Sequence, residues 1–297
     1  MTSSSRTTSS ARSTRRRATL GVALAASLAF VGAPARAQGV LVAPQAVFVD
    51  HRTRSGSVEL YNPGVEPAEV TVSALFGYPV TDSLGRTTLF TSAAPDSAAP
   101  SAAAWVSAFP RRLTLAPRQR QTVRLLVRPP QGLPDGEYWT RLVVEAKGGR
   151  VEVAGPEEGS GILVGLNLEV RTIIALLYRK GPVSTGVTLS GVRADVEGDS
   201  LAVRARLERT GNAAYLGQVH GALVNAAGRT VRSFDVPTAV YYALEPRYAL
   251  AVDDLTPGRY TLQLRVATDR ADMTGGALLR SPAVREAVTV TVPPRGR

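Results

Sequence analysis

Apolar and polar residues alternate along short stretches of this chain, and Gly, Pro, Asn or Asp interrupts them at intervals of about 8 to 12 residues. Helical spacing of apolar residues is nearly absent after residue 37. The pattern predicts an all-β chain with two similar runs of strands. The predicted strands are Val40–Val49, Ser57–Tyr61, Ala68–Phe76, Ala104–Leu115, Gln119–Val127, Glu137–Ala146 and Ile162–Tyr178, then Val187–Val192, Ser200–Arg209, Gly217–Val224, Thr230–Asp235, Tyr241–Ala251, Gly258–Ala267 and Ala283–Val292.

A short internal repeat supports this doubling. Residues Leu133–Val144 and Leu255–Val266 both begin with Leu-x-x-Gly-x-Tyr and continue as an alternating strand. Seven strands in each half are typical of an immunoglobulin-like sandwich, in which a tyrosine near the start of the penultimate strand bonds back to the preceding turn. We therefore predict two immunoglobulin-like β-sandwich domains in tandem, with tyrosine corners at Tyr138 and Tyr260. The alternative is that both tyrosines are ordinary half-buried strand residues.

The first 37 residues predict a signal peptide. A region with five arginines leads into the apolar stretch Ala18–Ala33, and Ala35 and Ala37 match the Ala-x-Ala rule, which places cleavage after Ala37. The apolar stretch is shorter than the ~20 residues of a membrane span. An uncleaved anchor and a twin-arginine export signal are the alternatives. The pattern indicates an exported, periplasmic protein.

The domain boundary is predicted at Gly181-Pro182, because proline ends strand pairing and permits a stiff bend. This gives a first domain at 38–180 and a second at 183–293. The segment Thr91–Ala104 consists mainly of Ala, Ser and Pro, and we expect it to be a mobile loop within the first domain.

Charge and composition argue against several functions. Cleavage would remove six arginines and no acidic residue, so the formal net charge would fall from +11 to +5. No cysteine is present, which excludes disulfides and thiolate chemistry. Aromatic residues are sparse, and the densest basic run fits a solvated strand face, so we expect no nucleic-acid binding. That run contains Arg111, Arg112, Arg118, Arg120, Arg124 and Arg128.

Catalytic motifs are missing from the sequence. The two histidines, His51 and His220, have no metal-ligand spacing around them, and no nucleophile elbow or glycine-rich phosphate loop occurs. The acidic pairs Glu157-Glu158 and Asp253-Asp254 lie in or beside Gly- and Pro-rich turns, where acids are usually solvated. The chain is thus predicted to be a binding protein, with no enzyme activity, metal, cofactor or small-molecule substrate.

The segment Ile162–Tyr178 is about twice the usual strand length. In its first part Val164, Leu166, Leu168 and Val170 fall on one face of the strand. They can simply complete the core of the first domain. Alternatively, a strand this long at a sheet edge can offer its backbone and an apolar ladder to another chain.

The first half of the chain resembles the PapD-like periplasmic pilus chaperones. The resemblance covers most of residues 40 to 180, while the second domain matches only as a generic sandwich. It is carried by Gln45–Phe48, Ser57–Pro63, Trp105–Pro117, Gln121–Val127, Leu133–Tyr138 and Leu176–Arg179.

The resemblance implies a function for several of these residues. In the family the long last strand completes an exported subunit, so Val164, Leu166, Leu168 and Val170 would be the client-binding residues. Glu137 and Arg179 match the charged residues that form an interdomain salt bridge. The two basic residues that hold the client's carboxylate are matched here by Gln45 and Ala175, which carry no charge.

The expected function is that of a chaperone-like protein for exported β-rich pilus or surface subunits. An outer-membrane usher is a possible second partner. The alternative is a structural or adhesive envelope protein in which both sandwiches are scaffolds.

Overall fold

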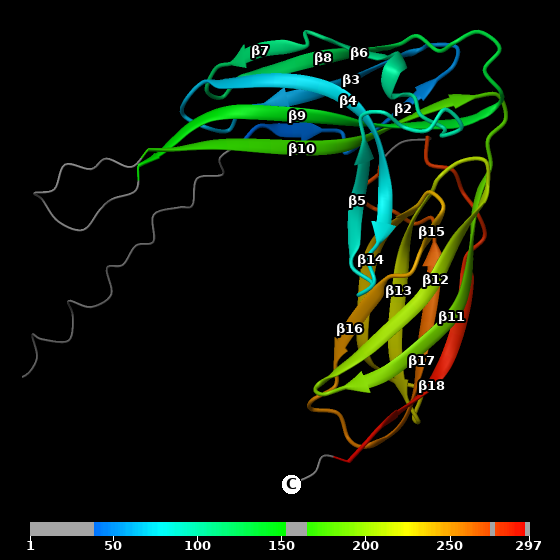
Figure 1. Cartoon of the computed structure of the whole chain (residues 1–297). Coiled ribbons are helices and arrows are strands. Elements are labelled where there is room, and N and C mark those ends of the chain that lie inside the picture. Colours follow the sequence, from blue (N-terminus) through cyan, green and yellow to red (C-terminus); the bar gives the residue numbers. More distant parts are fainter. Residues whose placement is uncertain (1–38, 153–164, 274–276, 295–297) are drawn as a thin grey trace, which may run out of the picture. The chain divides into compact units, whose positions relative to one another are not determined.

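Strands make up nearly all of the regular structure in the computed structural model, which describes residues 39–152, 165–273 and 277–294 (Figure 1). The side chains of residues 149–152 and 165–168 lie outside that description. Among the described residues, no helix is long and apolar enough to cross a membrane. The elements of the first sandwich are β1 (Leu41–Ala43), β2 (Ala46–Asp50), β3 (Ser55–Tyr61), β4 (Ala68–Thr81), β5 (Thr87–Ser92), the 3-10 turn η1 (Ala103–Trp105), β6 (Val106–Phe109), β7 (Arg112–Leu115), β8 (Arg120–Val127), β9 (Gly136–Glu152) and β10 (Gly165–Lys180).

Two sheets face each other in this sandwich. One has the order β1-β3-β8-β6 and the other the order β2-β10-β9-β4-β5, with β7 also paired to β4. Strand β8 shows why the sequence folds this way: Val123, Leu125 and Val127 are buried in the core, while Arg120 and Arg124 are exposed. Alternation of this kind buries one face of each sheet and leaves the other in water.

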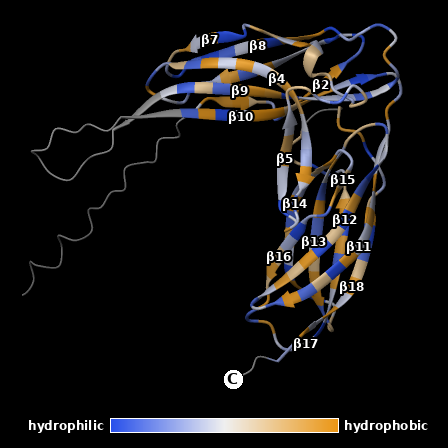
Figure 2. Cartoon of the chain, in the orientation of Figure 1, coloured by the Kyte–Doolittle hydropathy of each residue, from blue (hydrophilic) through white to orange (hydrophobic). Residues whose placement is uncertain are grey.

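The second sandwich follows the same plan. Its sheets have the orders β11-β12-β15, with β16 also paired to β12, and β14-β13-β17-β18. Apolar and polar residues alternate along β12 and β13, as Figure 2 shows. The prediction of an all-β chain with two immunoglobulin-like sandwiches in tandem is confirmed. Its strands are β11 (Thr185–Glu197), β12 (Ser200–Gly211), β13 (Tyr215–Asn225), β14 (Thr230–Val240), β15 (Ala243–Leu244), β16 (Arg247–Ala251), β17 (Gly258–Ala267) and β18 (Val284–Val292).

In the second sandwich the predicted strand Tyr241–Ala251 is divided into β15 and β16. Two predicted strands of the first sandwich are divided as well. The chain predicted as Val40–Val49 forms β1 in one sheet and β2 in the other, and the segment Ala104–Leu115 likewise forms η1, β6 and β7. In both cases the apolar residues continue across the division because each half packs on the same core. The proposed boundary at Gly181-Pro182 lies between β10 and β11, and the domain ranges remain predictions.

The segment Thr91–Ala104 is not the free loop that its composition suggests. Ala102 is fully buried, its N–H donates to the carbonyl of Trp139, and Trp139 in turn donates its N–H to the carbonyl of Pro100. The expectation of a mobile loop is wrong for this end of the segment, because strand β9 supplies backbone partners that composition does not reveal.

Tyr215, at the start of β13, is fully buried, and its hydroxyl has no hydrogen-bond partner among the described residues. Burial raises the pKa of Tyr215 to about 12, above its ordinary value of about 10. Ionisation of the Tyr215 hydroxyl therefore favours the unfolded state. The contribution of this group to the free energy of unfolding is complete below pH 10 and is lost as the pH rises to about 12.

We expect Tyr215→Phe to leave stability at pH 7 unchanged or to raise it by up to about 2 kcal/mol, because the variant removes an unsatisfied polar group. The same variant should lose less stability between pH 7 and pH 11 than the parent protein. Urea unfolding at both pH values measures this. A destabilised variant at pH 7 would contradict the prediction.

Candidate functional site

Strand β10 is 16 residues long and pairs with β9 over nearly its whole length (Figure 1). On its other side β10 pairs with β2, in parallel, but only from Ala175 to Arg179. Among the described residues no strand pairs with Gly165–Ile174 on that side. As far as the described residues show, more than half of β10 thus has an open backbone edge, which is the feature that lets another chain add a strand.

The four predicted client-binding residues fall in or before this open half. Val164 lies outside the described residues, and Leu166 and Leu168 belong to β10 by their backbone alone. Val170 is half-buried, and Gly39 lies against it: a Cβ placed on Gly39 would be 3.3 Å from a methyl carbon of Val170. Their role in binding therefore remains a proposal.

The structure brings Glu137 and Arg179 together where the two sandwiches meet. Arg179 Nε lies 2.7 Å from Glu137 Oε2, and the Glu137 side chain is completely buried. Glu137 Oε1 accepts hydrogen bonds from the backbone N–H of Ala214 at 2.9 Å and from Trp139 Nε1 at 3.1 Å. Arg179 also donates to the carbonyl of Ala277. Because Ala214 and Ala277 belong to the second sandwich, this ion pair links both sandwiches.

Aromatic residues surround the ion pair. Trp139 of β9 packs edge-on against Tyr241 and Tyr242, with ring centroids 4.7 and 5.2 Å apart. Tyr241 is buried, and burial raises the pKa of its hydroxyl. The cluster continues through Phe76 and Leu177 of the first sandwich, so the outer face of β9 and β10 is covered near their junction with the second.

Arg141 is a residue of this junction that sequence reasoning missed. It is almost fully buried on β9, its Nε donates to the carbonyl of Gly77 at 3.0 Å, and its guanidinium lies 5.0 Å from the centre of the Tyr241 ring. One of its terminal nitrogens has no partner among the described residues. The available signal was its place among apolar neighbours in Trp139–Val144, where a solvated arginine would be out of place.

A second link between the sandwiches is made by the β4–β5 hairpin. Near its tip, the carbonyl of Gly85 accepts a hydrogen bond from the N–H of Arg247, and the hydroxyl of Thr81 accepts one from the N–H of Glu245. A Cβ on Gly85 would lie 2.7 Å from the Cβ of Arg247, so the close approach requires glycine here.

The positions that correspond to the family's basic pair stay uncharged in the structure. Gln45 is exposed between β1 and β2, and Ala175 lies on β10 opposite Ala46 and Arg141. The guanidinium of Arg141 is directed to the carbonyl of Gly77 and the ring of Tyr241, and the residue is buried. A client carboxylate would therefore find no charged partner at Gln45 or Ala175.

The two predicted tyrosine corners have the expected geometry. The hydroxyl of Tyr138 donates to the carbonyl of Pro134 at 2.9 Å, and that of Tyr260 donates to the carbonyl of Thr256 at 2.7 Å. Each bond joins a penultimate-strand tyrosine to the turn four residues before it. Partial burial raises the pKa of Tyr138.

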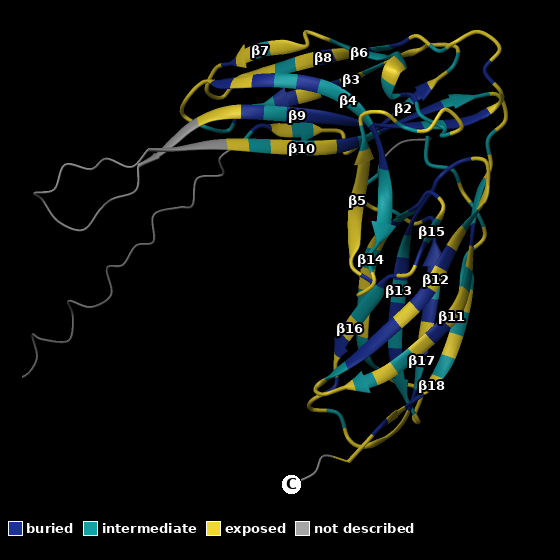
Figure 3. Ribbon diagram, in the orientation of Figure 1, coloured by how far each residue is buried: buried dark blue, intermediate teal, exposed yellow. Residues whose placement is uncertain are grey.

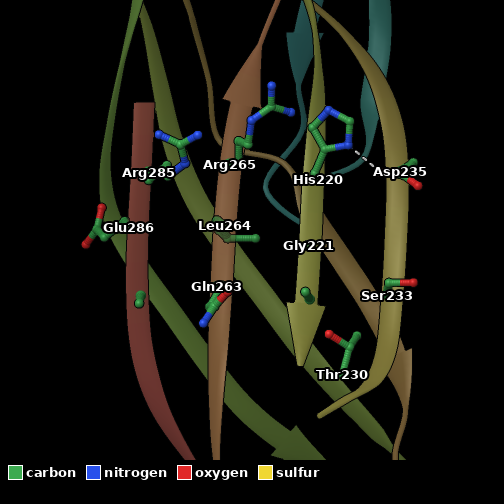
Figure 4. A pocket seen from close by; sticks show the side chains of 12 residues that line it. His220, Gly221, Thr230, Ser233, Asp235, Gln263, Leu264, Arg265, Arg285 and Glu286 are labelled. Carbon is green, nitrogen blue, oxygen red and sulfur yellow. Dashed lines mark hydrogen bonds and ion pairs between the residues drawn. The ribbon is translucent and has the colours of Figure 1, made fainter. Parts of the chain in front are cut away.

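The outer face of the β14-β13-β17-β18 sheet carries a groove of about 660 Å³ that includes His220 (Figure 4). The His220 ring lies between two carboxylates, with Nδ1 2.5 Å from Asp235 Oδ1 and Nε2 3.1 Å from Asp269 Oδ1. Although burial opposes the effect, hydrogen bonds from His220 and Arg265 lower the pKa of Asp269 to about 2. Both ring nitrogens of His220 are thus occupied by structural partners.

Other residues considered for chemistry have structural partners or lie elsewhere. His51 contacts the hydroxyl of Tyr178, and Asp254 forms an ion pair with Arg232 in the turn after β16. The pair Glu157-Glu158 lies outside the described residues. Within the part of the chain that the structure describes, no three His, Asp or Glu side chains are placed to hold a metal ion.

Comparisons with known proteins find structural relatives only. No family model matches the chain, and no curated protein matches it significantly. It is similar to a solved structure of the Salmonella enterica SafB chaperone with SafA pilin, with 16% sequence identity, a TM-score of 0.41, and coverage of 85% of this chain and 97% of that one. The YadV chaperone has 15% identity and a TM-score of 0.41, with 84% of this chain and 99% of that one covered. The E. coli chaperone DraB has 14% identity and a TM-score of 0.42, with 84% of this chain and 96% of that one covered. At these identities and TM-scores the likeness carries no weight for function, which has to be inferred from the residues of the chain.

Proposed function

We propose that this chain is a periplasmic, chaperone-like protein that binds exported pilus or surface subunits by donating strand β10 to their incomplete sandwiches. The observation that carries the proposal is the open edge of β10 from Gly165 to Ile174. An extended strand of a client can hydrogen-bond to such an edge while alternate aliphatic residues of β10 enter the core of the client.

The energetics of this contact do not require a charged clamp. Burying one aliphatic side chain contributes about 1.5 to 3 kcal/mol, and each new backbone hydrogen bond contributes about 0.5 to 1.5 kcal/mol net. A ladder formed by Val164, Leu166, Leu168 and Val170 would supply several such terms. A client could thus be held although Gln45 and Ala175 carry no charge.

Residues 1–37 act as a signal peptide cleaved after Ala37, and residues 38–180 and 183–293 are the two domains. The protein has no catalytic role, and its partner is an exported β-rich subunit, with an outer-membrane usher as a further partner. Intact-mass measurement of the exported protein tests the cleavage site.

We expect Leu168→Arg to abolish client capture while the thermal midpoint stays within a few degrees, because a client-binding role would leave this side chain outside the core of the free protein. Ile173→Arg is the matched control, since Ile173 lies on the same strand, is partly exposed and belongs to the opposite face by alternation. This control should keep client capture. Thermal melting and pull-down of β-rich exported proteins, identified by mass spectrometry, measure both.

A melt of Leu168→Arg that collapses by tens of degrees would show that the residue belongs to the core, because a buried unpaired charge costs several kcal/mol. Failure of the parent protein to bring down any exported β-rich subunit would favour a scaffold role in the envelope instead.

A further inference from the structure

A second candidate surface lies on the other sheet of the first sandwich, away from β10. The outer face of the β1-β3-β8-β6 sheet carries a groove of about 750 Å³. Short hydroxyl side chains line it at Ser57 and Thr122, beside the longer Arg124 and Phe109. Ser57 on β3 and Phe109 on β6 lie directly opposite Arg124 in the strand register. Phe109 is 55% exposed, so the cation of Arg124 and an exposed aromatic ring lie on neighbouring strands.

Arg124 lines this groove, and two further exposed arginines lie just beyond the ends of strand β8. Arg118, Arg124 and Arg128 lie on β8 or next to its ends and are exposed. Among the described residues, none of their guanidinium groups has a hydrogen bond or an ion pair. Arg120, also on β8, forms an ion pair with Glu59 at 2.5 Å. Glu59 is the one acidic residue on the described strands β1, β3, β8 and β6, so it is not available to the other arginines. The surface is therefore complementary to an anionic partner.

We propose that this face binds an extended acidic segment of a partner protein, with a carboxylate on Arg124 and an apolar side chain on Phe109. Strand β6 is the last strand of its sheet and pairs with β8 alone among the described strands, so its free edge can accept backbone hydrogen bonds from such a segment. An anionic membrane fits less well, because membrane binding needs a broad apolar face. The large exposed apolar side chains of this sheet, Phe109 and Leu41, belong to strands at its opposite edges.

Binding of a fluorescein-labelled peptide that alternates glutamate with phenylalanine tests the proposal by fluorescence anisotropy. The protein should bind this peptide and bind a counterpart with glutamine in place of glutamate at least about tenfold more weakly. Arg124→Ser and Phe109→Ser should each weaken binding about tenfold or more, as central contact residues do. Arg259→Ser is the matched control, since Arg259 is also exposed but lies on β17 of the second sandwich, and it should bind like the parent.

Several outcomes would overturn the proposal. These are absence of peptide binding, equal binding of the glutamine counterpart, or unchanged binding by both groove variants when melting shows that they are folded. Raising the ionic strength from about 0.01 to about 0.15 M, which shortens the screening length from about 30 to about 8 Å, should weaken peptide binding. Arg124-dependent binding to phosphatidylglycerol vesicles, without peptide binding, would assign the face to a membrane.

Discussion

Glu137→Ala is expected to lower the free energy of unfolding by about 3–5 kcal/mol, because it leaves the cation of Arg179 without its partner in a buried place. The same change removes the acceptor for the backbone N–H of Ala214 and for the indole N–H of Trp139. An exposed ion pair would contribute far less, but the Glu137 side chain is fully buried and only 13% of the Arg179 side chain is exposed. Urea unfolding followed by circular dichroism measures the effect.

Asp135→Ala is the control for this prediction. Asp135 lies two residues away and pairs with Lys180 at 2.7 Å, but its side chain is 51% exposed. We expect that variant to lose no more than about 1 kcal/mol, as surface ion pairs do. If Glu137→Ala cost as little as Asp135→Ala, the ion pair would not be the polar centre of the junction.

Trp139→Ala should cost about 3–5 kcal/mol as well, through the cavity that the large buried side chain leaves. Because Trp139 of the first sandwich packs on Tyr241 and Tyr242 of the second, the loss should also weaken the coupling between the sandwiches. Calorimetry should therefore show the variant unfolding in two separated transitions, with the parent protein unfolding more cooperatively.

Phe90→Ala provides the comparison, since its ring touches Tyr78 at a centroid distance of 5.2 Å but is 43% exposed. We expect it to cost about 1 kcal/mol and to leave the calorimetric profile unchanged. A Trp139→Ala protein with the parent's melting profile would mean that the aromatic cluster does not couple the sandwiches.

Alternation predicted most strands because most of them bury one face only. Strand β5 was missed for the opposite reason: from Thr87 to Thr91 every residue is exposed, so no apolar face marks it (Figure 3). Likewise, the sheet changes between β1 and β2 and between β6 and β7 leave no trace in a pattern that only records which residues face a core.

The junction was partly predictable. Glu137 and Arg179 came from resemblance to a family, and the alternating pattern alone would have given them no role. Residues from Trp139 to Val144 are buried on both faces of β9, since one face meets the first core and the other meets the cluster beside the second sandwich. An alternating pattern predicts a strand with one buried face and one solvent-exposed face. It therefore assigns neither Trp139 nor Arg141 to a contact between domains.

The β4–β5 hairpin has a consequence for the order of events during synthesis. The hydroxyl of Thr81 bonds to a residue 164 positions later in the chain. At about 5–20 residues per second, that residue is made about 8 to 33 s after Thr81. Tyr78 on this hairpin lies against Tyr242, so it also lacks this partner in that interval. The newborn first sandwich therefore spends that time with an uncovered aromatic face, and aggregation during expression should depend on how quickly the second half follows.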